Sequence, residues 1–134
     1  MLIESFKELK TATIPPHTYW WVASPYSKYP FGIDAAWETV CLATGTLIKA
    51  GVKVYSPIAH THPIAVHAKL DPYDHDIWLP AALPLMLASG GLLVLRMSGW
   101  SSSFGISEEI KVFDAANKPV RHVQWPFLDR YYND

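Results

Sequence analysis

The sequence predicts an α/β domain in which helices cover both faces of a four- to five-stranded parallel sheet. Segments rich in β-forming residues alternate with segments of helical periodicity, which is typical of repeated strand–helix units. The run GLLVLRM over 91–97 is short and continuously apolar, as expected of a strand covered on both faces. Half of the 134 residues are apolar, which is enough to bury the core of one domain spanning 1–134.

A short helix is expected at the start of the chain, in front of the first strand. Leu2, Phe6 and Leu9 recur at helical spacing, and the stretch TATIPPH is typical of a connector. Residues 1–17 are therefore expected to be an addition to the strand–helix repeat. They lack the positive-then-apolar order of a signal peptide, and the single cysteine forms no internal disulfide, so we expect a cytoplasmic protein.

The repeat begins with the β-rich run TYWWVAS over 18–24. Asp34 is a good capping residue, and an apolar stripe predicts a helix from there to about residue 50, with Gly51 as its C-terminal cap. The later elements are expected, in order, as strand 52–56, a loop with a short helix over 57–70, a loop over 71–76, a proline-interrupted buried helix over 76–88, strand 91–97, helix 105–116 and strand 120–125.

Charge and hydropathy argue against nucleic acid and membrane as partners. The formal net charge is −1 and the lysines and arginines are scattered, so no basic patch for nucleic acid is expected. Residues 77–95 are uncharged and long enough to cross a bilayer, but two prolines and a Gly-Gly pair interrupt them. A buried helix, a turn and a buried strand are expected there instead.

Three loops rich in polar and aromatic residues follow the first three expected strands. The carboxyl ends of parallel strands meet at one edge of a sheet, and ligands bind there where the strand order reverses. Tyrosines of the first loop are suited to stack on a flat ring, or alternatively to pack against the sheet edge. Histidines flanking a threonine in the second loop are expected to contact a ligand rather than zinc, because the sequence has no HExxH motif and no cysteine partner for them. The candidate ligand-binding residues of these two loops are Ser24, Pro25, Tyr26, Ser27, Ser56, His60 and His62.

The third loop, GWSSSFGISEE at 99–109, has the composition of an anion site. Gly105 allows a tight turn into the following helix, and the serine hydroxyls together with the first helical N–H groups offer a pocket for a phosphate. The alternative is that Ser102 or Ser103 only caps that helix. The candidate ligand-binding residues of this loop are Trp100, Ser101, Ser102, Ser103 and Gly105.

Two adjacent glutamates, Glu108 and Glu109, lie near the start of the helix that follows this loop. The helix dipole is expected to keep a carboxylate ionised there, and an ionised carboxylate can attack an anomeric carbon. Adjacent helical residues point about 100° apart, so at most one of the two faces the site. The alternative is that both simply match the dipole on a solvated surface.

Four successive stretches carry a resemblance to a known family: VASPYS, VYSPIAHTHPI, LLVLRMSGWSSSFGISEE and NKPV. From Tyr19 to Val123 the chain resembles the DUF1937 family, small proteins of the nucleoside 2-deoxyribosyltransferase superfamily. The resemblance implies a three-layer flavodoxin-like or Rossmann-like domain that cleaves or exchanges the N-glycosidic bond of a (deoxy)nucleoside or its 5′-monophosphate. It also implies a homo-oligomer, with a dimer favoured. The sequence has no dinucleotide-binding GxGxxG motif and no metal cluster, so no cofactor and no metal are expected. The aromatic residues of the tail that are suited to such an interface, or to folding back over the sheet, are Trp125, Phe127, Tyr131 and Tyr132.

The S-x-G-x-x-x-E pattern of the superfamily selects Ser103, Gly105 and Glu109 in this chain. The resemblance therefore implies that Glu109 is the nucleophile. It also implies that the backbone and serines of 101–105 hold a 5′-phosphate and that residues 24–27 line the sugar site.

The chain departs from its relatives in the acid that would protonate the leaving base. Relatives commonly carry an aspartate on the helix before the third strand, and PAALPLMLAS has none. Asp76 lies upstream and is the candidate substitute, with His60 and His62 as alternative sources of the proton. Arg96 stands where relatives often have an acid. The alternative function is a non-catalytic nucleotide-binding module that has lost this acid, and a third is an interaction protein without a ligand.

Overall fold

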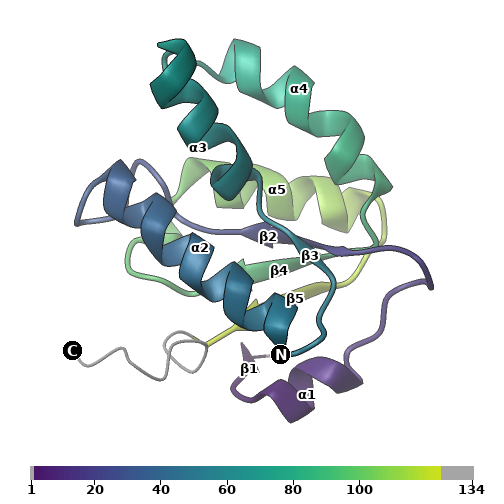
Figure 1. Ribbon diagram of the computed structural model, residues 1–134. Coiled ribbons are helices and arrows are strands. Elements are labelled where there is room, and N and C mark those ends of the chain that lie inside the picture. Colours follow the sequence, from purple (N-terminus) through teal and green to yellow (C-terminus); the bar gives the residue numbers. More distant parts are fainter. Residues whose placement is uncertain (1, 125–134) are drawn as a thin grey trace.

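The computed structural model describes residues 2–124 and contains a five-stranded sheet in which every strand is parallel to its neighbours (Figure 1). The strand order is β1-β5-β4-β2-β3. The strands are β1 (Leu2–Ile3), β2 (Trp20–Ala23), β3 (Val54–Tyr55), β4 (Gly91–Leu95) and β5 (Val120–Val123). The helices are α1 (Phe6–Thr11), α2 (Ile33–Lys49), α3 (Pro57–Ala68), α4 (His75–Ala88) and α5 (Phe104–Ala115), with a 3₁₀ turn η1 (Trp100–Ser102) before α5. The predicted α/β architecture with a parallel sheet is confirmed.

Helices cover both faces of the sheet, as the apolar strands predict. Along β2, Trp20 and Val22 pack in the core on the α1 and α2 side, while Trp21 and Ala23 pack in the core on the α4 and α5 side. All five residues of β4 are buried as well. No helix among the described residues is long and apolar enough to cross a membrane.

The order of the strands reverses beside β2. This strand pairs with β3 on one side and with β4 on the other, and the order β3-β2-β4-β5 is that of a flavodoxin-like sheet. The loops after β2 and β4 touch at this point. Gly99 has a φ of +88°, and a Cβ atom built on it would lie 2.3 Å from the Lys28 carbonyl oxygen.

The start of the chain differs from the expected helix. Leu2 lies in β1, where it pairs with His122 of β5, and the helix begins only at Phe6, after Ser5 caps it. Backbone hydrogen bonds to the neighbouring strand β5 hold Leu2 and Ile3 in an extended conformation. The helical spacing of the apolar residues gives no sign of this pairing. The N-terminal segment therefore contributes a strand to the sheet.

Two predicted helix starts are wrong. Helix α2 begins at Ile33 after Gly32, and Asp34 bonds a histidine instead of capping the helix. Gly105 makes no tight turn, because it lies inside α5 and the residue with positive φ in this loop is Gly99.

The segment after β3 is helical from its first residue. Ser56 caps α3 by accepting a hydrogen bond from the Ala59 N–H at 3.1 Å, and Pro57 occupies the first helical position. His60 and His62 therefore lie on a helix and not in the predicted loop.

Helix α4 is not the buried helix that its apolar sequence predicts. Of its residues only Met86 is buried, and most of its other large apolar side chains are exposed. Helix α5 contacts β2, β4 and β5 and covers most of the sheet face on which α4 also lies. Helix α4 therefore has little of the sheet left to pack against, and most of its surface stays exposed. The tail aromatics from Trp125 onward lie outside the described residues.

Candidate active site

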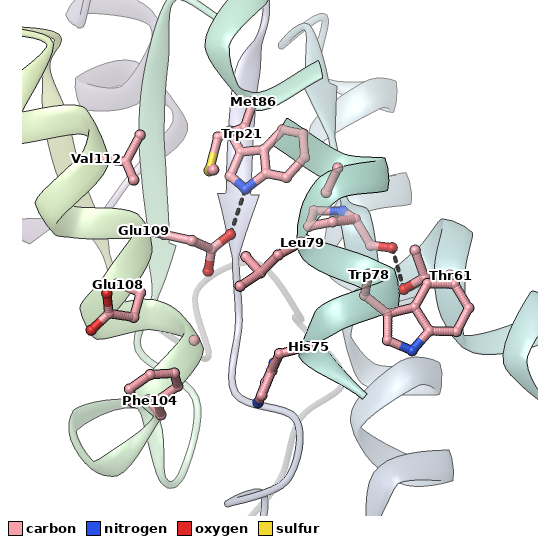
Figure 2. A pocket seen from close by; sticks show the side chains of 13 residues that line it. Trp21, Thr61, His75, Trp78, Leu79, Met86, Phe104, Glu108, Glu109 and Val112 are labelled. Carbon is pink, nitrogen blue, oxygen red and sulfur yellow. Dashed lines mark hydrogen bonds between the residues drawn. The ribbon is translucent and has the colours of Figure 1, made fainter. Parts of the chain in front are cut away.

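A pocket with a volume of about 160 Å³ lies between α5, β2 and α4 (Figure 2). Its walls are mainly apolar and aromatic, and four of its lining residues carry polar side chains that matter here: Thr61, His75, Glu108 and Glu109.

Glu109 reaches from α5 toward the sheet and is held there by Trp21. The Trp21 Nε1–H donates a hydrogen bond to a Glu109 carboxylate oxygen at 2.5 Å. Burial raises the pKa of the Glu109 carboxyl group to about 7, and the hydrogen bond from Trp21 opposes this rise. The expected effect of the helix dipole is thus outweighed by desolvation, and near neutral pH Glu109 is populated in both its protonated and its ionised form.

Glu108 has a different environment. Its carboxylate accepts a hydrogen bond from the Lys111 ammonium group at 3.1 Å on the surface of α5. Figure 2 shows the carboxylates of Glu108 and Glu109 pointing in different directions, as the spacing of adjacent helical residues predicts. Glu109 is the one directed at the indole of Trp21. A desolvated carboxyl group of this kind can act as a nucleophile when ionised.

The opposite wall of the pocket is formed by α4. Trp78 and Leu79 supply apolar surface, and the His75 ring lies 5.7 Å from the ring of Phe104 on α5. None of these residues was predicted from the sequence, and neither was Trp21. The alternation of side chains along β2 offered one signal, since it places Trp21 on the same face of the sheet as the helix that carries Glu109.

A hydrogen-bonded network lies beside this pocket. The Tyr26 hydroxyl is 2.6 Å from His62 Nδ1, and His62 Nε2 is 3.0 Å from Asp34 Oδ1. Burial, as the main cause, raises the pKa of Tyr26 to about 12, so its hydroxyl keeps its proton. In the tautomer of His62 that carries its proton on Nε2, the Tyr26 hydroxyl donates to Nδ1 and the Nε2–H donates to Asp34. The Trp37 ring stacks on the buried His62 at 5.2 Å. The network joins the loop after β2, the start of α2 and helix α3.

Five of the predicted site residues lie in or next to the pocket. Gly105 and Glu109 line the pocket itself. Tyr26 and His62 line a neighbouring hollow that shares Thr61, His75 and Trp78 with it, and His60 lines a second hollow that shares Trp21 and Thr61.

The remaining candidates do not line these hollows. Ser24 and Pro25 are buried, Ser27 is exposed, and Ser56 is occupied as the cap of α3. Asp76 is exposed, and its N–H bonds the Asp74 side chain.

The predicted phosphate loop behaves mainly as a helix cap. The Ser103 hydroxyl accepts a hydrogen bond from the Ile106 N–H at 3.2 Å, which is the alternative that the sequence left open. Ser101 and Ser102 are exposed in the 3₁₀ turn. The Trp100 ring packs against the Arg96 guanidinium group, which lies 4.5 Å from the ring centroid.

Within residues 2–124, no three His, Cys, Asp or Glu side chains lie close enough together to hold a metal ion. The family model described as a domain of unknown function, DUF1937, matches residues 18–125. The chain belongs to the DUF1937 family. The match spans every residue of the pocket, so the pocket lies in the DUF1937 domain and not in the N-terminal addition. No curated protein matches the chain.

Proposed function

We propose that this DUF1937 protein cleaves or exchanges the N-glycosidic bond of a (deoxy)nucleoside or its 5′-monophosphate, with Glu109 as the nucleophile. The proposal places the family in the nucleoside 2-deoxyribosyltransferase superfamily and the activity in the cytoplasm. The observation that carries it is the position of Glu109: a desolvated carboxyl group, held by the Trp21 N–H, on the wall of an apolar pocket.

In the proposed reaction the ionised carboxylate of Glu109 attacks C1′ of the sugar while the bond from C1′ to the base breaks. The resulting glycosyl ester is resolved by water or by a second base. The Trp21 N–H fixes the orientation of the carboxylate by binding one of its oxygens. Trp78 and Phe104 offer aromatic surface for a flat base.

The test is release of free base from a panel of nucleosides and nucleoside 5′-monophosphates. We expect release by the wild-type protein and by Glu108→Gln, because Glu108 is paired with Lys111 at the surface. Glu109→Gln should lower the rate by at least about 10³-fold, since the amide cannot form the ester. Equal release by Glu109→Gln rejects the nucleophile.

The alternative is a nucleotide-binding module without turnover. The position of Asp76 favours this alternative. Asp76 is exposed and does not line the pocket, so it is not placed to protonate a base bound there. Such a module shows a ligand-dependent rise of the unfolding midpoint with the same panel but no free base.

We also propose that two copies of the chain pair through α4. The helix exposes large apolar side chains and carries no charge after its first turn. Asp74 caps the N-terminus of α4 and Asp76 lies in its first turn. At the C-terminus of α4 the Lys118 ammonium group donates hydrogen bonds to the carbonyl oxygens of Leu87 and Ser89. Antiparallel packing of two such helices buries the apolar surface and brings each acidic end near a partner's lysine, which favours a second copy as the occupant.

A further inference from the structure

We propose that His75 is the group that protonates the leaving base. This inference rests on the proposed function and adds to it the acid that the sequence does not supply in its usual place. The sequence offers Asp76, the residue next to His75, for this role, with His60 and His62 as alternatives.

His75 and Glu109 lie on opposite walls of the pocket. Asp74 caps α4 by accepting a hydrogen bond from the Asp76 N–H at 3.1 Å, which makes His75 the first residue of the helix. From there His75 lines the pocket on the α4 wall, while Glu109 lines it on the α5 wall (Figure 2). A ligand in this pocket is therefore contacted by the nucleophile and the imidazole from two different elements.

The surroundings of His75 have a shape that suits a flat ligand. Its ring lies 5.7 Å from the Phe104 ring, with 54° between the ring planes, and Trp78 lines the same pocket one helical turn further along α4. Three flat side chains around one opening suit the flat face of a nucleobase. This arrangement places the base at the His75 end of the pocket and the sugar toward Glu109.

The imidazole of His75 is available, whereas the other polar groups of the pocket are committed. The Thr61 hydroxyl donates to the Pro57 carbonyl oxygen at 2.9 Å, and Glu108 is paired with Lys111. The Trp21 N–H is committed to Glu109. Within the described residues no hydrogen bond engages the His75 imidazole, and histidine is the side chain best suited to transfer a proton near neutral pH.

Protons and electron pairs balance in the proposed step. A carboxylate oxygen of Glu109 forms a bond to C1′, and the electron pair of the C1′–N bond moves onto the base. The His75 imidazolium gives its proton to the base, which leaves neutral, and His75 becomes a neutral imidazole. When water attacks C1′, His75 takes a proton from it, the ester bond breaks and Glu109 returns as a carboxylate.

The experiment compares two classes of substrate on His75→Gln. One is a nucleoside with a natural base, and the other is the 4-nitrophenyl glycoside of the same sugar. Its leaving group, 4-nitrophenolate, departs as an anion and needs no proton. We expect His75→Gln to lower kcat/KM for the natural nucleoside by about 10²-fold or more and to change it less than about 5-fold for the nitrophenyl substrate. Asp76→Asn is the control and should leave both values unchanged.

Each outcome separates this inference from the proposed function. Equal losses on the two substrates, or no loss on either, overturn the role of His75 as an acid while leaving Glu109 as nucleophile. If the wild-type protein releases neither leaving group, the proposed function itself fails. Unfolding midpoints of the two variants are measured alongside, so that a loss by unfolding, which affects both substrates, is recognised.

Discussion

At Glu109 the requirements of stability and of the proposed reaction conflict, because the reaction needs an ionised carboxylate at a position where burial disfavours the charge. Burial raises the pKa of its carboxyl group from 4.5 to about 7, so between these values the folded protein binds more protons than the unfolded chain. The contribution of Glu109 to the free energy of unfolding is fully present below about pH 4.5, and it is lost as the pH rises through about 7. The loss is at most about 3.5 kcal/mol, because one pKa unit corresponds to about 1.4 kcal/mol.

Replacing Glu109 with glutamine tests this balance. The amide oxygen still accepts the Trp21 N–H, but the side chain carries no charge. We expect the unfolding midpoint of Glu109→Gln to exceed that of the wild type at pH 8, and the difference to shrink toward zero at pH 4. Thermal unfolding across this pH range measures it. A difference that does not change with pH contradicts the burial of the carboxylate, and Glu108→Gln should differ little from wild type at either pH.

At the scale of elements, α4 is the part of the fold that the sequence describes least well. Its apolar composition predicts a buried helix, yet its exposed leucines face away from the described core. Hydrophobicity indicates that a surface avoids water, but it does not say whether the same chain or another covers it. The sequence could therefore locate the helix without identifying what packs on it.

The proposed pairing through α4 predicts a change of mass on one substitution. Leu83→Asp places a charge in the apolar surface of α4, and we expect it to convert a dimer into a monomer at micromolar concentration. Leu42→Asp is the matched control, because Leu42 is an exposed leucine on α2, on the other face of the sheet. Sedimentation equilibrium distinguishes the two. A wild-type protein that is monomeric, or a Leu83→Asp variant that stays dimeric, contradicts the pairing.

For the whole molecule, the loops that follow β2 and β4 meet at one edge of the sheet. Gly99 permits this contact, since its φ is +88° and a Cβ atom would meet the Lys28 carbonyl oxygen. We expect Gly99→Ala to lower the free energy of unfolding by about 2 kcal/mol or more. Denaturant unfolding measures the change.

Gly45→Ala is the control for this substitution. Gly45 lies within α2, and a Cβ atom added there would have no neighbouring atom within 4 Å beyond its own helix backbone. Alanine has the higher helix propensity, so this variant should be as stable as wild type or up to about 1 kcal/mol more stable. Equal losses for both variants would show that the contact between the two loops is not what matters.

The sequence predicted the layers and most elements because alternation and periodicity are local signals. It did not predict β1, whose two residues are a strand only because β5 offers an edge to pair with. In the site, the resemblance to the superfamily pattern selected Glu109, whereas its partner Trp21 is 88 positions away and required the folded chain. For the serines of residues 101–103 the sequence left two interpretations open, because the spacing that suits a phosphate equally suits a helix cap. The structure shows the cap at Ser103.

The central claim is that Glu109 forms a covalent bond to the sugar of a nucleoside. Peptide mass mapping after rapid acid quench of the protein with its substrate tests it most directly. We expect an added pentosyl or deoxypentosyl mass on the peptide that contains Glu109, with fragmentation placing it on that residue. An adduct on Glu108, or release of base by a protein that carries no adduct and is unaffected by Glu109→Gln, would contradict it.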